Sequence, residues 1–291
     1  MSWVVDSSLT YCQKFCINVL KCGPIPRHVA FIMDGNRRFA TKKHVEKAEG
    51  HTKGFDKLAE CLQWCMEFGI KEATVYAFSI ENFKRSKEEV DTLMRLAREK
   101  FKVLFEEKEK LMEEGVCIRV IGNMDLLPDD IKENIAKTML LTKNNKTVFL
   151  NVAFAYTSRD EISNSVKTVV QGVKDNKITI NDINKELLKK CLYTNLSPDP
   201  DILIRTSGEV RLSDFLLWQS TNTQIYFADV LWPEFTVWHL MACIFKYQRS
   251  YYNIEKFKEY NNNVRCKNSY ISEFVEGVHR ERLELLENYV K

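Results

Sequence analysis

One short segment of the sequence places a carboxylate, a glycine and two guanidinium groups directly after an apolar run. The run covers residues 28–33, and the polar segment reads Asp34-Gly35-Asn36-Arg37-Arg38. A single carboxylate can hold Mg²⁺ when phosphate oxygens and water supply the remaining ligands. Planar guanidinium groups fit phosphate oxygens, and a glycine lets an anion approach the backbone closely. The segment therefore predicts a site for a metal-bound phosphate.

Two further polar clusters also follow apolar runs. The second cluster is Ser79-Ile-Glu81-Asn82-Phe83-Lys84-Arg85, and the third runs from Arg205 to Ser213 and includes Arg211. Functional sites in open α/β sheets lie beyond the carboxyl ends of the strands, so we expect the three clusters to meet. Around Asp34 they would gather guanidinium groups that repel one another without an anion. Two diphosphates with Mg²⁺ would balance that charge.

His51 stands just before a helix that the sequence predicts to begin near Lys53. A histidine at a helix start can donate to a phosphate or protonate a leaving group. The alternative is a helix cap or a buried, hydrogen-bonded histidine, which the spacing alone favours. The sequence contains no Walker A motif, no G-x-G-x-x-G and no G-x-S-x-G, so nothing positive points to nucleotide binding or to a serine hydrolase.

The elements that must position these clusters are predicted from apolar runs separated by helical patterns. The runs cover residues 28–33, 72–79, 117–121, 148–155, 201–204 and 225–230. Near-continuous apolar strands are typical of a parallel sheet covered on both faces. We therefore predict an α/β fold with a central, mostly parallel six-stranded sheet flanked by helices.

A long helix is predicted after the second run. Ser86 and Glu89 have the spacing of a capping box, and Gly115 is the expected stop. Its apolar stripe is typical of ordinary core packing, and the alternative is one wall of a long apolar channel. Ser158 and Glu161 predict a second capping box.

The two ends of the chain are predicted to be helical, which divides it into 1–23, an N-terminal amphipathic helix, 24–252, a catalytic domain, and 253–291, a C-terminal helical tail. One stripe of the first helix holds Val5, Leu9, Cys12, Phe15, Cys16 and Val19, with Trp3 in front. This helix either packs on the body of the protein or rests on a membrane surface.

The composition excludes some classes of protein. The formal net charge is only +3, which argues against a bulk nucleic-acid binder. No apolar stretch reaches the roughly 18 residues of a spanning helix. The nine cysteines include no C-x-x-C pair, so we expect reduced thiols in a cytosol-facing protein. Cys12/Cys16 and Cys61/Cys65 are predicted to pack as small apolar side chains.

The motifs together resemble a known family. They are His28 to Arg38, Gly50-His51, Phe78 to Arg85, Ile204 to Gln219, and Val230-Leu-Trp-Pro-Glu234. In this order, over residues 24–250, they are similar to the signature regions of the cis-prenyltransferases (undecaprenyl diphosphate synthase-like proteins), and most of all to the eukaryotic dehydrodolichyl diphosphate synthase branch. The resemblance implies the fold of that family, with a hydrophobic tunnel. It also implies repeated addition of isopentenyl diphosphate to farnesyl diphosphate with cis double bonds, giving a dolichol precursor.

The resemblance further implies a role for each motif residue. The allylic diphosphate would be held by Asp34, Gly35, Asn36, Arg37, Arg38 and His51. Isopentenyl diphosphate would be held by Arg85, Arg205, Arg211 and Ser213. Ser79 would line the reacting region, and Asn82 would assist proton loss. The catalytic residues so implied are Asp34, Asn82 and His51, with Asp34 as the ligand of Mg²⁺.

Three departures from the family pattern qualify these roles. Lys47 stands where many members carry arginine, and Gln224 stands where bacterial members carry a second metal-binding glutamate. The end of the sequence lacks the Arg-x-Gly motif of single-subunit members, which implies a non-catalytic partner resembling the Nogo-B receptor. By the same resemblance, the protein would be peripheral to the cytosolic face of the endoplasmic reticulum membrane. The rival readings are a subunit without chemistry and an RNA binder that uses Trp218 and Trp232.

Overall fold

The computed structural model describes residues 9–262 and 269–290 of the 291-residue chain. In these residues one sheet contains six strands, all parallel, in the order β3-β4-β2-β1-β5-β6. The strands are β1 (His28–Ile32), β2 (Glu72–Ser79), β3 (Val116–Ile121), β4 (Val148–Tyr156), β5 (Ile202–Arg205) and β6 (Gln224–Phe227). The predicted six-stranded α/β sheet is confirmed.

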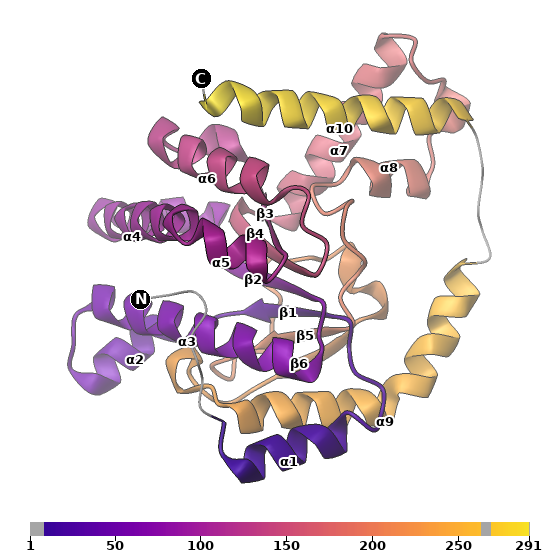
Figure 1. The fold of residues 1–291 in the computed structure, drawn as a ribbon. Helices are drawn as coiled ribbons and strands as arrows, with labels where there is room; N and C mark the ends of the chain where they lie inside the picture. Colours follow the sequence, from indigo (N-terminus) through magenta and orange to yellow (C-terminus); the bar gives the residue numbers. More distant parts are fainter. Residues whose placement is uncertain (1–8, 263–268, 291) are drawn as a thin grey trace.

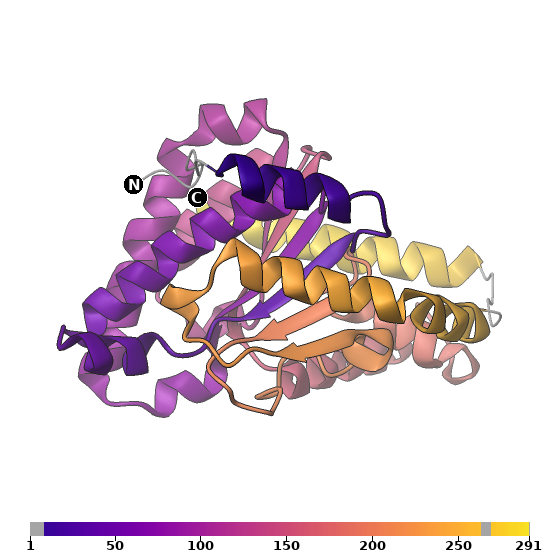
Figure 2. The ribbon, with the colours of Figure 1, turned by 90° about the horizontal axis from the view of Figure 1, so that it is seen from below.

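Helices cover both faces of the sheet (Figure 1). They are α1 (Tyr11–Leu20), α2 (Asn36–Lys43), α3 (Lys47–Phe68), α4 (Lys87–Glu106), α5 (Lys108–Glu113), α6 (Asp129–Thr142), α7 (Ser158–Lys174), α8 (Lys185–Cys191), α9 (Val237–Asn262) and α10 (Ser269–Val290). Five short 3₁₀ turns join some of these elements, among them η1 (Ile80–Lys84) and η5 (Trp232–Glu234). Seen from below, α1 lies alongside α9 on one side of the sheet (Figure 2).

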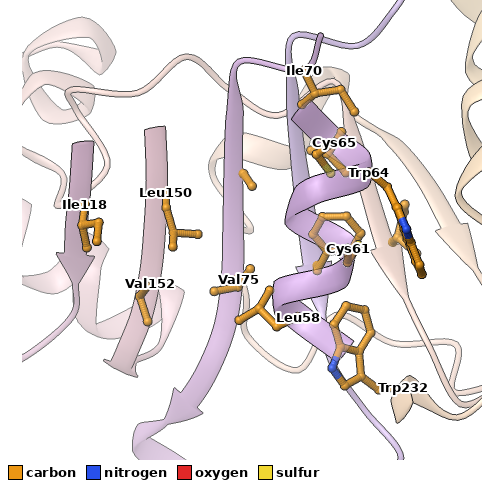
Figure 3. Close-up of a cluster of buried hydrophobic side chains, with 14 of the residues drawn as sticks. Leu58, Cys61, Trp64, Cys65, Ile70, Val75, Ile118, Leu150, Val152 and Trp232 are labelled. Atoms are coloured by element: carbon orange, nitrogen blue, oxygen red, sulfur yellow. The ribbon is translucent and has the colours of Figure 1, made fainter. Parts of the chain in front are cut away.

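Alternate residues of the strands build two different cores. Val29 and Phe31 of β1 belong to the large apolar cluster that α3, α4, α6 and α9 also enter. Ala30 and Ile32 point to the other face and join a smaller cluster with Phe215. Figure 3 shows part of the large cluster, in which Val75 of β2 lies beside Leu58 of α3, and Leu150 and Val152 lie on the neighbouring strand β4. The period of two in side-chain direction explains why near-continuous apolar strands suit a doubly covered sheet.

The strand order places a switch point beside β1. β1 pairs with β2 on one side and with β5 on the other. The chain therefore leaves β1 toward one half of the sheet and later returns to build the other half. Segments that follow β1, β2 and β5 meet at the carboxyl edge, where open α/β sheets bind ligands.

The predicted long helix is interrupted. It breaks at Glu107 into α4 and α5, and Leu111 of α5 is buried beside β3. Gly115 follows in a left-handed conformation (φ 64°), as a helix stop requires. The capping box is half formed, because Ser86 Oγ accepts the amide of Glu89, while the Glu89 carboxylate pairs with Arg85 instead.

The second predicted capping box is wrong. The cap of α7 is Thr157, whose Oγ1 accepts the amide of Asp160. Ser158 is the first helical residue, and its hydroxyl accepts the amide of Leu217. Glu161 is fully buried and accepts hydrogen bonds from the hydroxyls of Tyr156 and Thr194. The side chains of Ser158 and Glu161 therefore both bind tertiary partners and do not cap the helix.

The stripe predicted on the first helix is divided between the body and the surface. Ile17, which lies off that stripe, is buried, and the carbonyl of Leu20 accepts a hydrogen bond from Gln248 of α9. Phe15 and Val19, which lie on the stripe, are 64% and 55% exposed. Trp3 and Val5 lie outside the described residues. The helix therefore packs on the body with one face and leaves apolar side chains outside.

Other predictions for the ends and the cysteines have mixed outcomes. The boundary predicted at residue 252 lies inside α9, which runs on to Asn262. Cys61 and Cys65 are buried as predicted, but Cys12 is exposed. All eight cysteines in the described part of the chain are free thiols. Across residues 9–262 and 269–290, no helix combines the length and apolar character needed to cross a membrane.

Candidate active site

A polar cavity of about 960 Å³ opens at the carboxyl ends of β1, β2 and β5. Residues from all three predicted clusters line it: Asp34, Gly35, Asn36, Arg37, Arg38, His51, Ser79, Asn82, Arg85, Arg205, Arg211 and Ser213. The structure thus brings every predicted site residue to one place. Seven basic side chains line the cavity against four acidic ones, so it favours an anionic ligand.

Asp34 follows β1 and faces this cavity. One carboxylate oxygen accepts the amide of Gly35 at 2.7 Å, and the other accepts Nη2 of Arg205 at 2.7 Å. Partial burial raises the pKa of Asp34, but the hydrogen bond and charge of Arg205 outweigh it and hold that pKa below its ordinary value. Gly35 has φ 108°, and a Cβ there would lie 2.9 Å from Leu231, so the turn requires glycine.

Arg205 connects the ends of two strands. It is only 2% exposed, and beyond Asp34 it donates through Nη1 to the carbonyl of Arg211 and to Ser213 Oγ, each at 2.6 Å. Its Nε is buried without a partner. Ser213 and Asp214 have φ of 48° and 60°, so the loop that Arg205 holds is strained. Such strain is typical of ligand-binding loops.

The arginines are paired with carboxylates that the sequence analysis did not assign. Glu89 pairs with Arg85 at 2.7 Å and Arg37 at 3.6 Å, and Glu209 pairs with both Arg38 and Arg211. These carboxylates lower the repulsion that we predicted for the cluster without an anion, which corrects that expectation. Glu209 stands two residues before Arg211 in the third cluster, which is a signal that could have identified it.

The cavity also contains the ion pair between Arg159 and Asp214, with 2.8 Å between Nε and Oδ2, which sequence reasoning missed. Arg159 follows β4 by three residues, at the same edge of the sheet as the predicted clusters. Because the run 148–155 was not followed by an obvious cluster, only the strand order could place this arginine. It adds a further positive charge to the rim.

His51 lies inside α3, which begins at Lys47, and not before the helix as predicted. Its Nε2 is buried and has no hydrogen-bond partner. Burial lowers the pKa of His51, and the charge of Arg85 lowers it further, to about 4. The imidazole is therefore neutral at pH 7, and the alternative of a hydrogen-bonded core histidine is not what the structure contains.

Ser79 and Asn82 form a reciprocal cap around η1. The Asn82 carboxamide oxygen accepts the amide of Ser79 at 3.0 Å, and Ser79 Oγ accepts the amide of Glu81. This cap fixes both side chains at the rim of the cavity. The carboxamide oxygen of Asn82 keeps a second lone pair beyond this hydrogen bond, and its NH₂ group can donate, so Asn82 can both accept and donate at the cavity.

A second, mainly apolar cavity of about 130 Å³ adjoins the polar one. Seven residues line both cavities, among them Asn36, His51 and Phe78. The α4 side chains Leu93, Leu96, Ala97 and Phe101 form one wall, so the helix is both core and cavity wall. Lys100 also lies in this wall, with its Nζ 4.1 Å from the ring centre of Phe55.

The two departures in the motif regions lie in different places. Lys47 lines the polar cavity, where it can supply a charge but not a planar fork. Gln224 is the first residue of β6 and pairs in register with Ile202, at the amino end of the sheet. Within this chain Gln224 is therefore remote from Asp34.

The residues present fit an Mg²⁺ ion that the protein and the phosphates of the substrate bind together. No group of three or more histidine, cysteine or acidic side chains with metal spacing occurs in the described ranges. Asp34 is the predicted metal ligand among the four acidic residues that line this cationic cavity, whose volume is large enough for diphosphate groups. Mg²⁺ commonly binds through one or two carboxylates and substrate phosphates, so this donor set fits a metal that arrives with its substrate.

Comparisons with known proteins agree with this geometry. Residues 32–254 match the family model described as "Putative undecaprenyl diphosphate synthase". A human protein, dehydrodolichyl diphosphate synthase complex subunit DHDDS, is 58% identical over 89% of this chain and 78% of its own length. A tritrans,polycis-undecaprenyl-diphosphate synthase (geranylgeranyl-diphosphate specific) of Pyrococcus abyssi is 46% identical over 81% of this chain and 89% of its own.

A solved structure is similar over most of the fold. It is lavandulyl diphosphate synthase from Lavandula x intermedia in complex with dimethylallyl diphosphate. The TM-score is 0.72 at 32% identity, covering 77% of this chain and 95% of the plant protein.

Proposed function

This chain belongs to the cis-prenyltransferase family, and we propose that it extends farnesyl diphosphate by repeated addition of isopentenyl diphosphate, with cis double bonds, to make a dolichol precursor. The observation that carries the proposal is the junction of the two cavities, where a cationic chamber continues into an apolar one. An allylic diphosphate has the same two parts. Its diphosphate fits among the arginines, and its hydrocarbon fits beside α4.

Binding of the allylic diphosphate is assigned to the segment after β1 and to the start of α3. Its residues are Asp34, Gly35, Asn36, Arg37, Arg38 and His51. The amino end of α2 adds free backbone amides and a positive dipole. Because the diphosphate gains negative charge as the carbon–oxygen bond breaks, fixed positive groups stabilise the transition state more than the bound substrate.

Binding of isopentenyl diphosphate is assigned to the other side of the cavity. Its residues are Arg85, Arg205, Arg211 and Ser213. The strained loop and Arg205 hold these groups in place before the substrate arrives, which reduces the entropy that binding costs. Two anchored diphosphates align the alkene with the allylic carbon. Ser79 and Asn82 lie at the reacting region between them, and Asn82 assists proton loss.

Mg²⁺ is the proposed metal, with Asp34 as its protein ligand. When bound, the ion neutralises charge on the departing diphosphate. Before the ion binds, the ion pair between Arg205 and Asp34 keeps the carboxylate ionised and oriented toward the cavity.

The growing chain is proposed to enter the apolar cavity and to extend it into a tunnel along α4. Burial of hydrocarbon stabilises the bound product by about 25 cal/mol per Å². Each added isoprene unit therefore favours retention of the chain. The length at which elongation stops depends on the side chains that close this cavity.

A partner and a membrane complete the proposal. The human relative is named as a complex subunit, and we infer that this chain also works with a non-catalytic subunit resembling the Nogo-B receptor. The exposed Phe15 and Val19 on α1 suit contact with a membrane surface. We place the complex at the cytosolic face of the endoplasmic reticulum, where a membrane can receive a long lipid product.

The deciding experiment is incubation with farnesyl diphosphate, labelled isopentenyl diphosphate and Mg²⁺, with and without the partner subunit, followed by product sizing. We expect long polyprenyl diphosphates with the partner present. Absence of any chain elongation under both conditions contradicts the enzymatic proposal. Full activity without a partner contradicts the two-subunit proposal alone.

A further inference from the structure

Two glycines one helical turn apart on α3 face the first residue of α2. A Cβ added at Gly50 would lie 2.4 Å from the carbonyl oxygen of Asn36 and 3.0 Å from Cβ of Ala40. A Cβ added at Gly54 would lie 2.2 Å from Oδ1 of Asn36. These approaches are far inside van der Waals contact, so a side chain at either glycine forces Asn36 to move.

Backbone conformation does not explain these glycines. Both lie within α3 and neither has a positive φ. In a helix interior each glycine costs about 1 kcal/mol relative to alanine, so two of them weaken the start of α3. Gly277 of α10 provides the contrast, because a Cβ there meets nothing within 4 Å. Close packing with Asn36 is the property that Gly50 and Gly54 share.

Asn36 and His51 are placed together at the junction of the two cavities, and both line both of them. Oδ1 of Asn36 and Nε2 of His51 are each buried without a hydrogen-bond partner. Buried polar atoms in proteins are nearly always paired, so two unpaired ones at one junction indicate groups held ready for a ligand.

A third element fixes the position of Gly54. The indole Nε1 of Trp232 donates to the carbonyl of Gly54 at 2.7 Å, and the backbone amide of Trp232 donates to the carbonyl of Asp34 at 3.0 Å. Trp232 is fully buried, and Figure 3 shows it beside α3 near Leu58. This side chain therefore ties the backbone of Gly54 to the strand end that carries Asp34.

We propose that Gly54, supported by Gly50, is a positioning residue for Asn36. Its missing side chain seats the Asn36 carboxamide against α3 and holds it beside His51, where the diphosphate of an allylic substrate meets its hydrocarbon. Neither glycine acts on the substrate itself. The inference rests on the proposed function and adds how the amino end of α2 is aligned with α3.

The first test compares Gly54→Ala with Gly277→Ala in the full chain with its partner subunit. We expect Gly54→Ala to lower kcat by about tenfold to a hundredfold, because a displacement of about 1 Å at a reacting centre has effects of this size. The KM for isopentenyl diphosphate should stay unchanged, since its proposed ligands lie at or beyond the ends of β2 and β5 and none of them lies on α2 or α3. Gly277→Ala should keep the wild-type kcat. A wild-type kcat in Gly54→Ala overturns the proposal.

The second test is a double-mutant cycle with Asn36→Ala. If Gly54 acts through Asn36, the double variant should be no slower than Asn36→Ala alone, because the added methyl group no longer meets a carboxamide. Losses that multiply in full would overturn the proposal. If Gly54→Ala does not fold, we expect the double variant to fold, because the clash with Asn36 has been removed. Failure of the double variant to fold would also overturn the proposal that Gly54 positions Asn36.

A third readout is independent of turnover and separates this inference from the proposed function. In protein labelled with ¹⁵N-asparagine, the side-chain amide signal of Asn36 is assigned by its loss in Asn36→Ala. We expect that signal to shift in Gly54→Ala and to stay in place in Gly277→Ala. An unchanged signal in both overturns the positioning role, whether or not the chain elongates a prenyl diphosphate.

Discussion

The two ends of the sheet both collect polar and charged side chains, but they differ in how those groups are satisfied. At the amino end, His28 contacts the carbonyl of Pro198 through Nδ1 and the hydroxyl of Thr74 through Nε2, each at 2.7 Å. Asn151 donates to Glu72 at 2.7 Å, and Glu72 lies 3.6 Å from Arg119. These groups face one another across neighbouring strands and enclose no large cavity among those described.

At the carboxyl end, positive charge is in excess and the charged side chains surround an open cavity. Six arginines share four carboxylates there, and they border the cavity of about 960 Å³. Buried atoms of Asn36, His51 and Arg205 lack partners there. Away from this cavity, the same holds among the described residues for Oδ1 of Asn151 and for Oε1 of Gln219, in the turn before β6. Polar strand ends alone therefore do not mark a site. Unsatisfied groups around an open volume do.

The largest effect expected from this contrast is loss of activity without loss of the fold. Asp34→Asn keeps the contact with Gly35 but removes the negative charge that we propose to bind Mg²⁺. We expect chain elongation to fall by about a thousandfold or more, since metal and charge stabilisation are lost together. Incorporation of labelled isopentenyl diphosphate measures it, with the fully exposed Asp129→Asn as control. Activity within about tenfold of wild type would remove Asp34 from the mechanism.

The opposite outcome is expected at the amino end. Glu72→Gln weakens the buried contact with Arg119 and one hydrogen bond with Asn151. We expect the free energy of unfolding to fall by about 1–3 kcal/mol, because buried polar partners are left poorly matched. Urea unfolding measures this loss, with the exposed Glu106→Gln as control. A large drop in kcat of the folded variant would contradict the claim that the polar groups at the amino end serve stability and not activity.

A smaller effect is expected within the site itself. Arg211→Lys keeps the charge but loses the planar fork, so the KM for isopentenyl diphosphate should rise by about tenfold with little change in kcat. Arg98→Lys, in an ion pair with Asp130 away from the cavity, is the matched control. Equal KM values for both variants and the wild type would contradict the assignment of Arg211.

The last effect concerns pH. Because the folded state lowers the pKa of His51 to about 4, it binds fewer protons than the unfolded chain, whose histidines titrate near about 6.5. Lowering the pH from about 6.5, the pKa in the unfolded chain, to about 4, the pKa in the folded state, therefore destabilises the folded state. We expect His51→Gln to lose less stability than wild type between about pH 7 and pH 4.5.

Urea unfolding of the wild type and of His51→Gln at a series of pH values measures this difference. If both proteins show the same dependence of unfolding free energy on pH, folding does not lower the pKa of His51 and the prediction is wrong.

Much of the fold was predictable because strand signals are local. Buried parallel strands need apolar residues on both faces, so the runs at 28–33 and 72–79 identified β1 and β2. The polar segments after them were predicted to meet because parallel strands share one carboxyl edge. Helix ends were less predictable, since Ser158 and Glu89 found tertiary partners in place of the local caps.

The sequence by itself determined the strands, the segments that carry Asp34 and Arg205, and the family to which the chain belongs. Only the tertiary structure decided that Glu89 and Glu209 neutralise the arginines, and that Gly54 leaves room for Asn36. The physical reason is the separation along the chain between the residues that interact. An apolar run or a turn acts between neighbours in the chain, whereas an ion pair or a close approach depends on which distant segments the packed sheet brings together.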